Sequence, residues 1–143
     1  KESPFFYLME TARNLCLVLE KKADLGREIR LAYSQEDKET LQEIANIKIP
    51  VLLQRLQDFY QSFRTQWNLE NKSFGFEVQT VRIGGLLQRL KDVQEILNAY
   101  LREEISGIAE LNEPQKAFHY FEQNEIRSLN YNLWTDIVSP SKI

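Results

Sequence analysis

Turn-forming residues are scarce in this sequence. Five glycines and four prolines stand among its 143 residues, which is about half of the roughly 12% that proteins use on average. Because turns depend heavily on these two residue types, the scarcity indicates few turns and long regular elements, which we expect to be helices. The length corresponds to one domain, and a chain of roughly 150 residues buries about two-thirds of its unfolded surface in one core.

Cysteine is nearly absent, and the sequence also lacks a large net charge and long apolar runs. Cys16 is the only cysteine, so the chain forms no internal disulfide, which fits a reducing, cytoplasmic location. Its position on an apolar helical stretch predicts a buried thiol. The formal net charge of −3 argues against nucleic acid as the main partner, since phosphate binding needs a basic surface. We also expect no membrane segment, because no apolar run approaches the roughly 20 residues that span a bilayer, and no signal peptide.

The residues that build catalytic or metal sites are few and scattered. His119 is the only histidine, which leaves no histidine pair for a zinc ion. Nothing marks Cys16 and His119 as a nucleophile and its base. Gly84-Gly85 lacks the spacing of a phosphate-binding loop and lies within a helical pattern. We therefore expect no catalytic residue, no metal and no cofactor in this chain.

Apolar or small residues recur at steps of three and four along the first quarter of the chain. Ser3-Pro4 is a typical helix start. The stripe that follows consists of Leu8, Ala12, Leu15, Leu19, Ala23, Gly26, Ile29 and Tyr33. This spacing predicts one helix of about eight turns with its stripe toward the core. Gly26 lies on the stripe, which we interpret as a close helix crossing rather than a break.

The middle of the chain predicts a short helix and a long one. Residues 34–37 are turn-like and are expected to cap a short helix that carries Leu41, Ile44 and Ala45. Pro50 then requires a kink or a new start, because proline cannot donate to the preceding turn. The apolar spacing that follows predicts a long helix from about residue 49 to the polar stretch 68–72.

A further long helix is predicted from about residue 77 to 106, with Gly107 as its C-cap. Residues 108–143 show no sustained period. Within them we expect a short helix at 117–121 and a lone strand at 133–138, whose pairing partner would belong to another domain or chain.

These elements need one another, because an isolated amphipathic helix is only marginally stable in water. Three long helices joined by brief loops predict a mainly α fold, an antiparallel helical bundle with one or two short helices and an irregular C-terminal tail. We expect residues 1–143 to form a single helical accessory domain. The missing initiator methionine suggests that it is excised from a longer protein.

Large aromatic residues form the first group of candidate interface residues. Four of them fall in predicted loops or at helix ends, namely Trp67, Phe74, Phe76 and Trp134. Rings of this size need cover. They form either a satellite cluster under the loop between two helices or an interface with another domain or a second copy. Arg82 joins the candidates, since arginine is enriched with aromatic residues at interfaces.

Gly84 and Gly85 are the second group of candidates. Each glycine costs roughly 1 kcal/mol relative to alanine inside a helix. We interpret the pair as a place where a neighbouring helix or domain packs on the backbone. The alternative is a hinge or a backbone that faces a ligand.

The most specific motif in the chain extends from Gln66 to Leu90. Its distinctive parts are Gln66-Trp67, Glu70-Asn71, Phe74-Gly75, Glu77-Val78, Arg82, Gly84-Gly85-Leu86 and Arg89-Leu90. This pattern resembles the C-terminal helical domain of a bacterial subgroup, subgroup C, of the glycoside hydrolase family 20 β-N-acetylhexosaminidases. Residues 22–27 together with 32–33, and residues 134–141, are similar to the same domain, so the resemblance covers nearly the whole chain.

The resemblance implies that the chemistry lies in another part of the protein. Enzymes of this family release terminal N-acetylhexosamine from glycans in a (β/α)₈ barrel, where an Asp-Glu pair works with the acetamido group of the substrate. This sequence contains no Asp-Glu step and lacks the alternating strand–helix units of a barrel. No catalytic residue therefore carries over. The implied partners are the catalytic barrel domain of the same protein and a second copy in a homodimer.

A second interpretation needs no such parent enzyme. A free-standing helical module for protein–protein interactions, either an adaptor or a sensory bundle, has the same composition and periodicity. A small independent enzyme has the least support, because the sequence shows no catalytic constellation. The sequence upstream of Lys1 distinguishes the first two: a barrel with an Asp-Glu pair favours the hydrolase, whereas a transmembrane or receiver segment favours the module.

Overall fold

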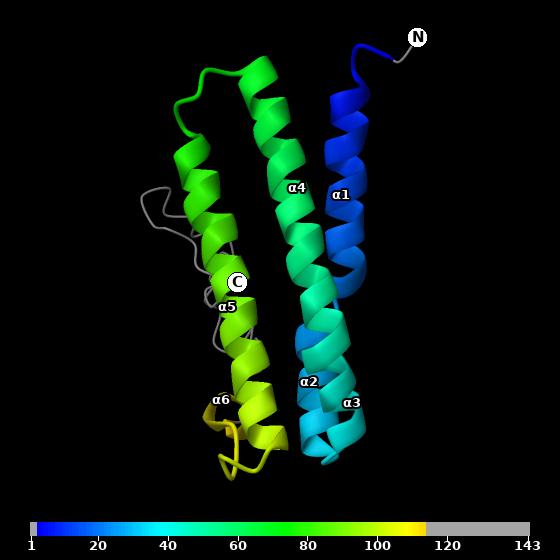
Figure 1. The fold of residues 1–143 in the computed structure, drawn as a ribbon, viewed down its shortest axis with the longest axis vertical. Helices are drawn as coiled ribbons and strands as arrows, with labels where there is room; N and C mark the ends of the chain where they lie inside the picture. Colours follow the sequence, from blue (N-terminus) through cyan, green and yellow to red (C-terminus); the bar gives the residue numbers. More distant parts are fainter. Residues whose placement is uncertain (1–2, 114–143) are drawn as a thin grey trace, which may run out of the picture.

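Three long helices dominate the computed structural model, which describes residues 3–113 (Figure 1). They are α1 (Phe6–Lys22), α4 (Ile49–Glu70) and α5 (Phe76–Leu101). Helix α4 lies between the other two and packs against both, and neighbouring helices run antiparallel. The predicted mainly α bundle is thereby confirmed. The helix predicted at 117–121 and the strand predicted at 133–138 lie outside the described residues.

The predicted first helix is wrong in its extent, because it is two helices. Helix α1 ends at Lys22, and α2 (Leu25–Ser34) begins after a turn. The turn lets α1 follow α4 while α2 packs on α3 (Lys38–Glu43). Gly26 marks no helix crossing, since a Cβ there would meet no heavy atom within 4 Å in the described part. Tertiary packing, rather than a local helix breaker, sets this boundary.

Helix α1 also turns a different side to the bundle than the sequence predicts. Its buried residues are Thr11, Asn14 and Val18, which lie between the predicted stripe and the charged side of the helix. The amide of Asn14 donates to Oγ of Ser62 at 3.1 Å on α4. Two polar residues thus occupy the contact with α4, so hydrophobic periodicity alone could not identify the buried side.

A π-helical segment, η1 (Ile44–Lys48), joins α3 to α4 at the predicted irregularity before Pro50. The N–H of Ile49 donates to the carbonyl of Ile44, five residues earlier. The carbonyl of Ala45 then has no helical donor left, because Pro50 has no N–H. Gln94 on α5 donates to this carbonyl at 2.7 Å. A side chain from a neighbouring helix thus satisfies a buried backbone group that the proline leaves unpaired.

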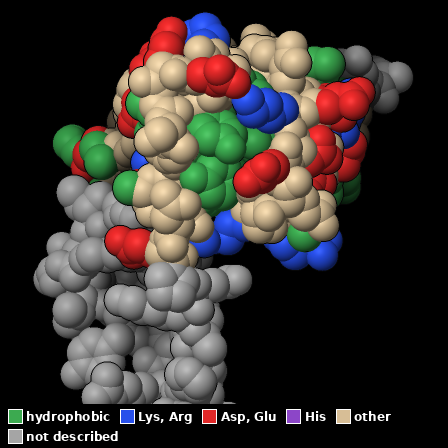
Figure 2. Space-filling view, turned by 90° about the horizontal axis from the view of Figure 1, so that it is seen from below, with side chains coloured by type: hydrophobic (Ala, Val, Ile, Leu, Met, Phe, Trp, Pro, Cys, Tyr) green, Lys and Arg blue, Asp and Glu red, His purple; other side chains and the backbone are tan. Residues whose placement is uncertain are grey.

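The core lies in the half of the molecule where α2, α3 and η1 pack against α4 and α5. Its most deeply buried large side chains are Leu41, Ile44, Ile49, Leu52 and Leu97. Figure 2 looks at this end and shows hydrophobic side chains gathered at its centre within a rim of charged ones. The three long helices extend from this core toward the other end of the molecule.

The end of α5 differs from the prediction. The helix stops at Leu101 rather than near residue 106, and a short loop leads to α6 (Ala109–Asn112). Gly107 is therefore no C-cap. A Cβ on Gly107 would lie 3.2 Å from the hydroxyl of Tyr33 and 3.2 Å from the side-chain nitrogen of Asn112. These two side chains approach the backbone closely, so a Cβ here would require them to shift by a few tenths of an ångström.

Candidate interaction surfaces

An aromatic cluster fixes the loop between α4 and α5. Phe76 is 7% exposed, and its ring lies between 5.5 and 5.7 Å from the rings of Tyr60, Phe63 and Trp67. The indole N–H of Trp67 donates to the carbonyl of Lys72 at 2.9 Å. The structure thus places Trp67 and Phe76 in a cluster within the domain, the first of the two alternatives predicted for them.

Gly75 explains how the loop makes its sharp entry into α5. Its φ of +96° lies in the left-handed region, which glycine adopts without strain. A Cβ at this position would lie 3.4 Å from the Trp67 ring. The short Phe-Gly-Phe sequence therefore directs one phenyl ring inward at Phe76 and leaves the other, Phe74, 86% exposed.

The outer face of α5 continues from this exposed ring. Val78 and Val81 are about half exposed, at 43% and 53%, and Arg82 and Gly85 follow at helical spacing. The Nε of Arg82 is buried and has no hydrogen-bond acceptor among the described residues. A polar group buried without a partner is costly, so an acceptor from elsewhere would stabilise it. We call Phe74, Val78, Val81, Arg82 and Gly85 the α5 outer face.

No neighbouring helix in residues 3–113 packs on the glycine pair. A Cβ on Gly84 or Gly85 would meet no heavy atom within 4 Å. An interface with another domain or a second copy at Phe74, Arg82, Gly84 and Gly85 stays a prediction. Trp134, the remaining candidate, lies outside the described residues.

A second apolar surface lies on α1 and its N-cap. Six exposed residues form it: Phe5, Met9, Ala12, Leu15, Cys16 and Leu19. The predicted burial of Cys16 is therefore wrong, and so is the core-facing orientation of the stripe in α1. The charged residues Glu10 and Lys21 lie on another side of the helix, whereas Arg13 and Glu20 border this face. We call these six residues the α1 apolar face.

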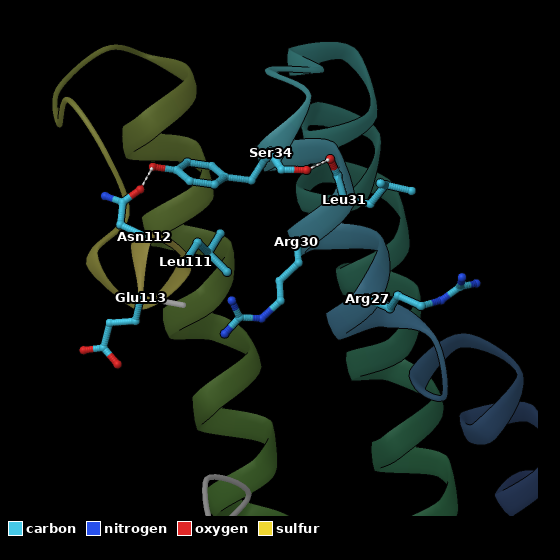
Figure 3. Close-up of a pocket in the computed structure, with 8 residues that line it drawn as sticks. Arg27, Arg30, Leu31, Ser34, Leu111, Asn112 and Glu113 are labelled. Carbon is cyan, nitrogen blue, oxygen red and sulfur yellow. Dashed lines mark hydrogen bonds between the residues drawn. The ribbon is translucent and has the colours of Figure 1, made fainter. Parts of the chain in front are cut away.

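A hollow of about 600 Å³ lies between α2 and α6 (Figure 3). Its polar groups are largely occupied: the Tyr33 hydroxyl donates to Oδ1 of Asn112 at 2.9 Å, and the Ser34 hydroxyl donates to a carbonyl of its own helix. Arg30 points toward α6, whereas Arg27 points away from the hollow. Among the described residues that line it, Glu113 is the only carboxylate, whereas glycoside hydrolysis typically uses two such groups.

The shifted carboxyl groups belong to caps and surface ion pairs. A hydrogen bond from Lys38, at 2.8 Å, lowers the pKa of Glu103 below its ordinary value. Hydrogen bonds from Lys21 and then Arg55 lower the pKa of Glu20. Each of these carboxylates is paired with a cation, the usual arrangement of structural ion pairs. None of them is held near a second carboxylate as an acid and base.

Residues 3–113 contain neither a metal-binding cluster nor a membrane-spanning helix. No three histidine, cysteine, aspartate or glutamate side chains in this range gather where they could bind a metal ion. Within the same range, no helix combines the length and apolar character needed to cross a membrane.

Three long antiparallel helices with two exposed outer faces define a helical bundle domain. Comparison with known families shows which one. Residues 1–130 match the family described as Glycoside Hydrolase 20C C-terminal domain, and the chain belongs to this family. The resemblance carried by the motif from Gln66 to Leu90 is thereby confirmed. Membership implies a catalytic domain elsewhere in the same protein. No curated protein matches the chain.

Proposed function

We propose that this chain is the non-catalytic C-terminal domain of a β-N-acetylhexosaminidase, an enzyme that releases terminal N-acetylhexosamine from glycans. Its role is to support the catalytic barrel and to contribute to a homodimer. The family match over residues 1–130 is the observation that carries the proposal. The two outward apolar faces support it, since contiguous exposed apolar surface typically marks an interaction site. A cytoplasmic location completes the proposal and is supported by the single, exposed Cys16.

The proposal assigns catalysis to the part of the enzyme that precedes this domain. The family match supports this assignment, because the family is described as a C-terminal domain of glycoside hydrolases. No observation favours the adaptor or sensory module as a second candidate, because the family to which the chain belongs is defined by glycoside hydrolases.

Three proteins test the proposal: the full-length enzyme, the enzyme shortened to lack this domain, and this chain alone. Each is assayed for release of the aryl group from an aryl N-acetyl-β-glucosaminide, and the first two are also melted. We expect turnover from the full-length enzyme and none from this chain. The shortened enzyme should unfold at a lower temperature, because its docking surface is then open to water. Turnover by this chain alone would refute the non-catalytic role, and an unchanged melting temperature of the shortened enzyme would refute the supporting role.

A further inference from the structure

The α1 apolar face is exposed along the whole length of the helix. Met9 is 69% exposed, Phe5 60% and Leu19 50%. Cys16, also exposed, lies between Met9 and Leu19 on the same side of the helix. Such a continuous apolar side is typical of a helix that is covered on that side as well as on its buried one.

The exposed side is separate from the contact that holds α1 in the domain. Asn14 donates to Ser62, and Arg55 of α4 donates to the carbonyl of Leu17 at 2.7 Å and to Glu20 at 3.0 Å. These bonds fix the orientation of α1 on α4, so α1 cannot rotate its apolar side inward without breaking them. Any cover for this side would therefore come from outside residues 3–113.

The size of the face favours a tethered partner over a second copy. A helix of 17 residues is about 25 Å long and about 10 Å wide, so one side presents on the order of 250 Å². A stable complex between separate proteins buries about 800 Å² on each partner. A domain of the same chain needs less, because tethering gives an effective concentration in the millimolar range.

The family identity indicates that the preceding domain of the same chain lies near the N-terminal end of α1. A C-terminal domain follows the catalytic domain along the chain, so the connection enters at the N-terminal end of α1. Phe5, Phe6 and Met9 lie at this end and are all more than half exposed. The first helix after the connection therefore presents its apolar side next to the preceding domain.

We propose that the α1 apolar face is the surface by which this domain docks on the catalytic domain of its own chain, against a complementary uncharged, apolar surface. This inference rests on the proposed function and specifies its partner surface. The partner is the preceding domain rather than a second copy or residues 114–143.

The reactivity of the native Cys16 thiol shows directly whether the α1 apolar face is covered in the full-length enzyme. Labelling with N-ethylmaleimide, followed by mass spectrometry of the Cys16 peptide, gives the labelling rate in native enzyme and in urea. We expect native labelling at least about tenfold slower, because the covered thiol reacts only after local opening. Dilution of the enzyme should not change this protection. Equal rates in native enzyme and in urea, or protection that disappears on dilution, would overturn the proposal.

A matched pair of variants separates this face from the rest of α1. Met9→Glu together with Leu19→Glu buries charge in the proposed contact and should restore fast labelling of Cys16. Glu10→Lys changes an exposed residue on another side of the same helix and should leave the protection unchanged. If both proteins stay protected, the α1 apolar face is not the docking surface.

Photocrosslinking identifies the occupant, even where a charged variant fails to fold. A benzoylphenylalanine at position 9 of the full-length enzyme should crosslink to the catalytic domain within one chain, and the same probe at position 10, on another side of the helix, should not. Crosslinks from position 9 to a second copy or to residues 114–143 would overturn the proposal. If these results fail while the shortened enzyme still loses stability, the face is wrong but the supporting role stands.

Discussion

Asn14 is the residue that orients α1, because it is a buried amide in a contact between two helices. Its Nδ2 lies 3.1 Å from Oγ of Ser62 and 3.4 Å from the carbonyl of Asp58. We predict that Asn14→Ala lowers the free energy of unfolding by about 0.5–1.5 kcal/mol, since the buried Oγ of Ser62 no longer accepts the Asn14 amide and keeps only its own bond to the carbonyl of Phe59. Urea unfolding followed by circular dichroism measures the change.

Two further variants test whether the hydrogen bond causes this loss. Arg13→Ala, at the neighbouring exposed position, should change the stability by no more than about 0.5 kcal/mol. Asn14→Leu combined with Ser62→Ala removes both polar partners and should cost less than Asn14→Ala alone. A larger loss in the double variant would show that packing volume, not the hydrogen bond, decides stability here.

Asp37 gives the domain a pH-dependent cap. The hydroxyl and backbone N–H of Thr40 donate to its carboxylate at 2.6 and 3.0 Å, and these bonds lower the pKa of Asp37 below its ordinary 3.8. Because the folded pKa lies below the unfolded one, the stabilisation is complete above pH 3.8 and is lost as the pH falls through the folded pKa.

Asp37→Asn tests this cap, since asparagine also caps helices but does not titrate in this range. We predict that the difference in melting temperature between the natural chain and the variant shrinks as the pH is lowered from 6 to about 2. A melting-temperature difference that stays constant over this range would contradict the prediction.

At the scale of elements, the sequence predicted local features such as caps correctly, but it did not predict which side of a helix is buried. Asp37 and Pro50 predicted a cap and an irregularity, and the structure has both. The break after Lys22 has no such signal, because it depends on α1 and α2 packing against different helices. The sequence also could not predict which side of α1 faces outward. Two of the three buried residues of α1 are polar, and one of them, Asn14, contacts α4 through a hydrogen bond to Ser62.

The π-helical segment η1 should depend on Gln94 of α5. We predict that Gln94→Met, which keeps the length of the side chain and removes its amide, destabilises the domain by about 1–3 kcal/mol, because the buried carbonyl of Ala45 loses its donor. Gln88→Met is the matched control, as Gln88 donates only to Asp92 on the same exposed side of α5. Equal unfolding free energies for the two variants would show that the Ala45 carbonyl needs no donor from α5.

At the scale of the whole molecule, two outer faces allow two partners. The α1 apolar face lies beside the chain connection, and the α5 outer face lies on the other side of α4. The sequence was sufficient to select some candidate residues, because aromatic residues in a predicted loop and glycines within a helical pattern are unusual. These candidates are Phe74, Gly84 and Gly85, with Arg82 beside them. The sequence could not show which aromatic rings are buried, because the left-handed turn at Gly75 separates the exposed Phe74 from the buried Phe76.

We propose that the α5 outer face forms one part of the larger homodimer interface of the proposed function, and Phe74 is its test. The side chain of Phe74 is 86% exposed, so Phe74→Ser should change the unfolding free energy by no more than about 0.5 kcal/mol. In a symmetric dimer the ring is lost from both copies, and an interface aromatic that contributes about 1.4 kcal/mol raises the dissociation constant about tenfold. Sedimentation velocity of the full-length enzyme measures this constant. Phe76→Ala, in the buried cluster, should instead lower stability by about 3 kcal/mol. An unchanged dimer with Phe74→Ser would remove this face from the dimer interface.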